Sequence, residues 1–163
     1  MAKDGIGARV LRKEDKRFIT GAGRYTDDIV LADQAYAAFL RSPHAHANVK
    51  NLDVSAAKAM PGVIDVLTGE QLVGDGIGNI ICGWTVNSTD GTPMGMGQYR
   101  ALEPEHVRYV GQAIAIVVAD SQAEAQNAME AIDVDWVEPE PVLQQDNALS
   151  GNDPGLHQDA PNN

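Results

Sequence analysis

Two histidines stand close together directly after an apolar part of the chain. His44 and His46 are separated by one residue and follow the apolar run 35–40. Side chains two positions apart on an extended backbone point to the same side, so both imidazoles could ligate one metal ion. A metal site needs further ligands, and no cysteine or acidic residue follows at a useful spacing. Packing or hydrogen bonding at an interface is favoured instead, because neutral imidazole both donates and accepts.

Three other candidates for chemistry have structural explanations. Arg41 ends the same apolar run, where its planar guanidinium can bind a carboxylate or backbone carbonyls, or can be an exposed charge at a strand end. Asp27 and Asp28 are adjacent and would face opposite ways on an extended backbone, so we assign them to a turn rather than to an acid–base pair. Cys82 lies in an apolar stretch and is predicted to be a small buried hydrophobe.

Motifs for nucleotide binding and nucleophilic catalysis are absent from the sequence. The glycines at 74–78 lack the spacing and the following helix of a dinucleotide fingerprint, and no Gly-Lys-Ser/Thr or Gly-x-Ser-x-Gly occurs. Cys82 is the only cysteine, which excludes an internal disulfide and a cysteine-ligated iron–sulfur cluster. We therefore predict no catalytic, cofactor-binding or metal-binding residues in this chain.

Composition limits the possible partners. The chain has 163 residues, enough for one domain with a core, and 44% of them are hydrophobic. With 12 basic and 23 acidic residues the net charge is −11, which disfavours nucleic acid and anionic membranes as partners. Neither a membrane-spanning run nor an apolar signal core is found, so the expected location is the cytoplasm.

The first half of the chain predicts short strands and one short helix. Apolar and β-branched runs indicate strands at 34–41, 48–54 and 63–67. A helix is expected at 55–60, with Ser55 as its N-cap. The glycine-rich excursion 74–105 is long for a loop, and we expect one strand in it, at 79–82.

The second half has the clearest patterns. A strand is expected from 107 to 110, with a bend at Gly111, and the continuous apolar run 113–118 is typical of a strand covered on both faces. Ser121 and Glu124 form a capping box for a helix that ends near 131. The alternation over 132–136 predicts a half-buried strand with its acidic face in water. Strands and short helices without a regular alternation indicate the α+β class.

Several segments together resemble one enzyme family, the large molybdenum-cofactor-binding subunits of xanthine dehydrogenases, aldehyde oxidases and aerobic carbon monoxide dehydrogenases. They include Arg-Ser-Pro-His-Ala-His-Ala at 41–47 and Val-Arg-Tyr-Val-Gly at 107–111. The matching segments occur in the family's order and cover nearly the whole chain: 12–21, 23–29, 39–47, 53–67, 107–111 and 117–120.

The resemblance implies an α/β hammerhead fold, with mixed strands and two or more short helices. It implies three parts: an N-terminal extended segment (1–33), the hammerhead domain (34–143) and a polar tail (144–163) leading to cofactor-binding domains. In such enzymes molybdopterin lies in those further domains, while 2Fe-2S clusters and FAD are carried on companion subunits or domains. This chain is then expected to hold no cofactor of its own.

The leading interpretation is a non-catalytic N-terminal domain of a molybdenum hydroxylase that oxidises a purine, aldehyde, N-heterocycle or carbon monoxide. Its expected partners are the remaining molybdopterin-binding domains and the iron–sulfur and flavin subunits. Arg41, Ser42, His44 and His46, together with the 74–105 excursion, are predicted to face these partners. One alternative is a free-standing hammerhead protein for binding or assembly. A small metal-dependent enzyme using His44 and His46 is disfavoured because ligands are missing.

Overall fold

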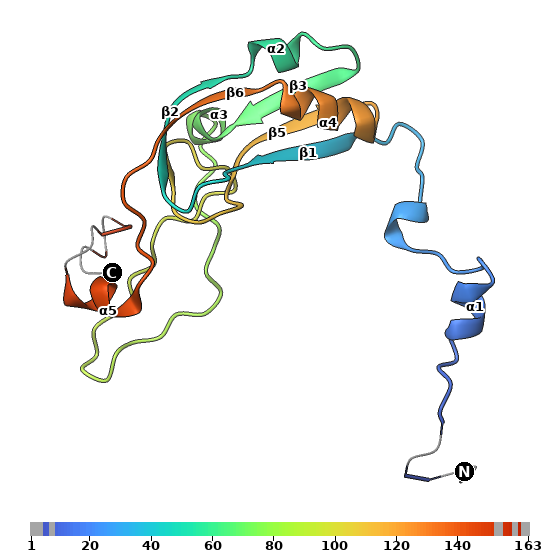
Figure 1. Ribbon diagram of the computed structural model, residues 1–163, viewed down its shortest axis with the longest axis horizontal. Coiled ribbons are helices and arrows are strands. Elements are labelled where there is room, and N and C mark those ends of the chain that lie inside the picture. Colours follow the sequence, from blue (N-terminus) through green and yellow to red (C-terminus); the bar gives the residue numbers. More distant parts are fainter. Residues whose placement is uncertain (1–4, 7–8, 152–154, 158–159, 161–163) are drawn as a thin grey trace. The chain divides into compact units, whose positions relative to one another are not determined.

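The computed structural model describes residues 5–6, 9–151, 155–157 and 160, and the chain divides into two compact units, Met1–Gln34 and Ala35–Asn163 (Figure 1). The residues 1–4, 7–8, 152–154, 158–159 and 161–163 of the two predicted end segments lie outside this description. Within the described part, no helix combines the length and the apolar character needed to cross a membrane.

The first unit contains helical turns in a segment expected to be extended. These are α1 (Asp15–Ile19) and the 3-10 turn η1 (Thr26–Asp28). The carboxylate of Asp28 accepts a hydrogen bond from the backbone N–H of Tyr25 at 2.8 Å, which confirms that this aspartate pair forms a turn. The rings of Phe18 and Tyr25 stack at 5.3 Å. Local hydrogen bonds and ring stacking therefore organise this segment.

The first sheet of the second unit is built around its most apolar strand. β5 (Ala113–Ala119) lies between β1 (Tyr36–Arg41) and β3 (Val63–Thr68), and both pairings are antiparallel. Ile114, Ala115, Val117 and Ala119 of β5 are fully buried. The continuous apolar run thus became a central strand, as predicted, because a strand covered on both faces has no position for polar side chains.

The second sheet has the order β4-β2-β6 and is also antiparallel. It consists of β4 (His106–Val107), β2 (Ala47–Asp53) and β6 (Asp133–Val137). Along β6 the two aspartates are exposed, whereas Val134 and Trp136 are half-buried, which confirms the predicted alternation. β4 is shorter than expected, because the backbone N–H of Arg108 bonds the side chain of Gln112 instead of a neighbouring strand.

The described residues of this unit also form four helices. α4 (Gln122–Glu130) packs on β1 and β5, with Ser121 as its N-cap. The Ser121 hydroxyl accepts from the N–H of Glu124 at 3.2 Å and donates to the Glu124 carboxylate at 2.7 Å, so the predicted capping box closes through the hydroxyl. The other helices are α2 (Ser55–Lys58), α3 (Gly69–Gly74) and, in the predicted polar tail, α5 (Gln145–Ser150).

A shared core joins the two sheets. One buried cluster contains Val66, Val117, Ala57 of α2 and Ala128 of α4, and a second contains Ala47, Val107 and Ile114. Leu40, Leu52 and Val134 pack against both clusters. The two sheets therefore form one α+β body, which confirms the predicted fold class.

Three local predictions were wrong. Ser55 is not the N-cap of α2; it is the first helical residue, and its N–H is bound by the carboxylate of Asp53 at 2.9 Å. In the described excursion between α3 and β4, residues 79–82 form no strand, and the single ladder contact is an isolated bridge between Asn87 and Pro93. Cys82 is exposed rather than buried, because this segment lies outside both sheets.

The Asp53 contact makes a testable contribution to stability. The hydroxyl and the N–H of Ser55 hold the pKa of Asp53 below its ordinary value of 3.8. A lowered folded-state pKa stabilises the fold above the ordinary value, and this stabilisation is lost as the pH falls through the folded-state value. We expect Asp53→Asn to lower the melting temperature at pH 6 and to have a smaller effect at pH 3. Ser55→Ala should reproduce part of the effect, and an Asp53→Asn effect equal at both pH values would contradict the assignment.

Candidate functional site

The last residue of β1 and the loop that follows it carry the four residues predicted to face other domains. Ser42 is buried, and its hydroxyl accepts a hydrogen bond from the N–H of His44 at 3.0 Å. Its backbone pairs with the turn before β5, since Gly111 N–H donates to the Ser42 carbonyl at 2.8 Å. Arg41 is exposed and donates from Nη1 to the Gly111 carbonyl at 2.8 Å. Arg41 thus donates to a backbone carbonyl and is also an exposed charge at the end of the strand.

The two histidines bind the chain segment that follows β6. Nδ1 of His44 lies 3.0 Å from the Glu138 carboxylate, and the ring of His44 meets Trp136 edge-on at 5.1 Å. Nδ1 of His46 lies 3.1 Å from the carbonyl oxygen of Glu140. Each imidazole is directed to a different partner, and within the described ranges no three His, Cys, Asp or Glu side chains gather as metal ligands. The pair therefore fixes the path of the chain as it leaves the second sheet.

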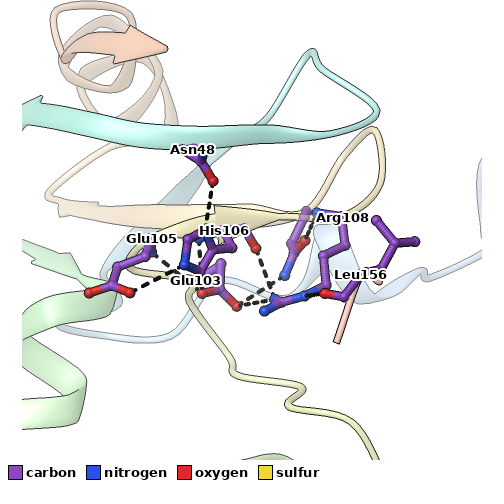
Figure 2. A network of polar contacts seen from close by, with 7 residues as sticks. Asn48, Glu103, Glu105, His106, Arg108 and Leu156 are labelled. Carbon is purple, nitrogen blue, oxygen red and sulfur yellow. Dashed lines mark hydrogen bonds and ion pairs between the residues drawn. The ribbon is translucent and has the colours of Figure 1, made fainter. Parts of the chain in front are cut away.

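A buried ion pair at the start of β4 was not predicted (Figure 2). Glu103 is 4% exposed, and its Oε2 lies 3.0 Å from Nη1 of Arg108. Its Oε1 accepts from the backbone N–H groups of Glu105 and His106, at 3.4 and 3.3 Å. Gln112, also 4% exposed, donates to Oε2 and accepts from the N–H of Arg108. One carboxylate thus organises the turn that leads into β4.

Arg108 extends this network to the C-terminal part of the chain. Its Nε donates to the carbonyl oxygen of Leu156 at 2.9 Å, and its Nη1 also donates to the carbonyl of His106 at 2.9 Å. Figure 2 shows the guanidinium between Glu103 and Leu156. His106 in turn binds the Asn48 side chain of β2 through Nδ1 at 2.6 Å. The network therefore joins the excursion, the second sheet and residues 155–157.

A pocket of about 670 Å³ lies beside the network. Three carboxylates (Glu70, Glu103, Glu105) and two guanidinium groups (Arg100, Arg108) line it, together with histidines. Because Glu103 and Arg108 neutralise each other, the remaining charged groups are two carboxylates and one guanidinium. The pocket therefore has a small excess of negative charge.

Known proteins are similar to this chain in sequence and in fold. Residues 20–140 match the family described as aldehyde oxidase and xanthine dehydrogenase, a/b hammerhead domain. The nicotine 6-hydroxylase large subunit of Paenarthrobacter nicotinovorans is 36% identical over 93% of this chain and 18% of its own length. The carbon monoxide dehydrogenase large chain of Afipia carboxidovorans is 39% identical over 85% of this chain and 16% of its own length.

The structural comparison agrees with the sequence comparison. The crystal structure of quinoline 2-oxidoreductase from Pseudomonas putida 86 matches with a TM-score of 0.71 and 36% identity, over 91% of this chain and 18% of that chain. The chain thus spans about one-sixth of the length of these relatives, and the predicted hammerhead fold is confirmed. The chain belongs to the aldehyde oxidase and xanthine dehydrogenase family and corresponds to its a/b hammerhead domain.

Proposed function

We propose that this chain is the structural hammerhead part of the large subunit of a molybdenum-dependent oxidoreductase. The observation that carries the proposal is the family match over residues 20–140, in relatives of whose length this chain covers only 18% and 16%. One relative is named as the molybdenum-binding subunit of a xanthine dehydrogenase, from Escherichia coli O157:H7. The relatives are large subunits or large chains, so further domains and companion subunits are the expected partners.

The substrate is proposed only by class: a purine, an aldehyde, an N-heterocycle or carbon monoxide. Relatives named for nicotine and for carbon monoxide match this domain at 36% and 39% identity. Compounds so different in size and polarity should be selected by different contacts. Residues that select the substrate should therefore lie outside the hammerhead domain, and the chemistry should be performed there as well.

The described residues do not fit a molybdenum cofactor. Molybdopterin carries a phosphate, which favours a cradle of backbone N–H groups and cationic side chains. In the pocket beside β4, Arg108 is already bound by Glu103, and the Glu70 and Glu105 carboxylates outnumber Arg100. We therefore place molybdopterin in the remaining domains, and the 2Fe-2S clusters and FAD on companion subunits or domains.

The loop that carries Arg41, Ser42, His44 and His46 is proposed as part of the surface that meets those domains. Arg41 lies 5.3 Å above the ring of Phe39, and both side chains are exposed on β1. The guanidinium has five N–H donors, which allows it to bind a partner as well as Gly111. Ser42, His44 and His46 hold the loop in shape and so preorganise the Arg41 side chain.

This surface can be tested by removing one charge. Arg41→Met keeps an apolar stem but removes all side-chain donors, and Lys50→Met is the matched control at an exposed position of β2. We expect Arg41→Met to lower the melting temperature of the whole natural protein more than that of this chain alone, because a contact with another domain is lost in addition to the Gly111 bond. Equal effects in both would remove Arg41 from the interface.

The proposed function is tested on the natural gene product that carries this sequence. Molybdenum content should approach one atom per large subunit, and a redox dye should be reduced when an aldehyde, purine, N-heterocycle or carbon monoxide is supplied. A gene product without molybdenum and without dye reduction would favour the alternative, a hammerhead protein for binding or assembly.

A further inference from the structure

The excursion between α3 and β4 contains a hairpin-like loop without regular strands, called the arm and defined here as residues 77–99. Its two halves are joined by backbone hydrogen bonds from Ile80 N–H to the Tyr99 carbonyl at 2.7 Å and from Met94 N–H to the Val86 carbonyl at 3.2 Å. At the tip, Gly91 has a φ of 86° and the chain turns back on itself. In Figure 1 this yellow-green segment leaves α3 as a long loop away from the two sheets. The arm is thus a defined protrusion of the second unit.

The arm exposes large apolar side chains to an unusual degree. Ile81 is 91% exposed, Trp84 79% and Ile80 62%. Other exposed apolar side chains of the arm are Ile77, Val86, Met94, Met96 and Tyr99. Single exposed apolar residues are ordinary, but several on one loop, including Trp, Met and Tyr, are typical of a segment that enters a protein interface.

The arm is also nearly without charge. Asp90, at the tip, is the only Asp, Glu, Lys or Arg between residues 77 and 99, in a chain with 12 basic and 23 acidic residues. A loop that stays in water has no physical reason to lack charged residues. Depletion of charge is characteristic of interface cores. The complementary surface should therefore be an apolar groove without a strong charge of either sign.

The C-terminal part of the chain indicates which partner offers this groove. The ring of His157 lies 5.6 Å from that of Tyr99, and a Cβ on Gly97 would come within 3.1 Å of the His157 ring. Residues 155–157 thus reach the base of the arm, where Arg108 also holds Leu156. A polypeptide attached there has a high effective concentration at the arm. A second copy is disfavoured, since association would bring together two chains that each carry a net charge of −11.

We infer that the 77–99 arm docks into an apolar groove on the remaining part of the same large subunit, with Ile81 and Trp84 as anchors. The inference rests on the proposed function, because it requires the longer subunit. Docking would bury the apolar side chains that this domain leaves exposed, and it would fix the hammerhead domain against the rest of the enzyme independently of the Arg41 loop.

Hydrogen exchange on the intact natural protein tests the inference. Amides of residues 77–99 should exchange slowly, and the double variant Ile81→Thr/Trp84→Ser should exchange them at least about tenfold faster. The control Ile64→Thr makes the first of these two changes at a 57% exposed position of β3 and should leave the arm protected. Molybdenum content is measured on every sample, so that loss of the proposed function is recognised separately.

Three outcomes would overturn the docking inference. The first is rapid exchange of the arm in a wild-type protein that contains molybdenum. The second is protection that disappears on dilution, which would identify a second copy as the occupant. The third is protection that disappears when a companion subunit is removed, which would assign the groove to that subunit.

Discussion

Replacing Glu103 by alanine is expected to lower the free energy of unfolding of this chain by about 3 kcal/mol, because Arg108 would remain largely buried without its counter-charge. The side chains of Glu103 and Arg108 are 4% and 12% exposed, so water cannot replace the lost carboxylate effectively. The backbone N–H groups of Glu105 and His106 would also lose their acceptor. Urea denaturation followed by circular dichroism measures the change.

The neighbouring glutamate provides the control for this prediction. The side chain of Glu105 is 75% exposed and lies 3.5 Å from His106, so Glu105→Ala should change the stability by less than about 0.5 kcal/mol. In a double-mutant cycle, Arg108→Met should cost much less when Glu103 has already been replaced by alanine. Equal costs of the two glutamate variants would show that the ion pair does not organise this turn.

Replacing Gly69 by alanine is expected to cost at least about 2 kcal/mol, because the segment 102–104 passes directly over this glycine. A Cβ on Gly69 would lie 2.6 Å from the backbone nitrogen of Pro104 and 2.8 Å from the carbonyl oxygen of Leu102. These atoms belong to the backbone and cannot rotate away, so α3 or the Glu103 turn must move. The same denaturation experiment gives the magnitude, and hydrogen exchange should show loosening at 102–108.

Gly74, at the other end of α3, is the matched control. A Cβ there would meet no heavy atom within 4 Å, and alanine is a better helix former than glycine. Gly74→Ala should therefore leave the chain as stable or make it slightly more stable. If Gly69→Ala behaved in the same way, the close approach of α3 to the Glu103 turn would not be a real constraint.

Local sequence patterns correctly predicted the strands and the helix cap that are determined by residues close together in the sequence. The apolar run of β5, the alternation of β6 and the Ser121–Glu124 cap each depend on neighbouring residues, and each is present in the structure. The error at Ser55 is also local in origin, since the carboxylate of Asp53, two positions earlier, accepts the N–H of Ser55, and Ser55 is then the first residue of α2 rather than its cap.

The Glu103 network could not be predicted in this way. In the sequence, Glu103 and Arg108 look like ordinary surface charges. They are buried only because β5 binds the backbone of Glu103 and α3 packs over it. Cys82 shows the reverse case: its apolar neighbours suggested burial, but the segment joins neither sheet and leaves the thiol exposed. Burial depends on contacts between distant segments, which no local pattern encodes.

The central claim is that this domain supplies structure while the molybdenum is held by other parts of the enzyme. Anomalous diffraction at the molybdenum edge, from crystals of the natural gene product, tests it most directly because it locates the metal. We expect one strong peak for each large subunit, outside the hammerhead domain and in contact with none of its side chains. A molybdenum peak within bonding distance of a side chain of residues 1–163 would contradict the account.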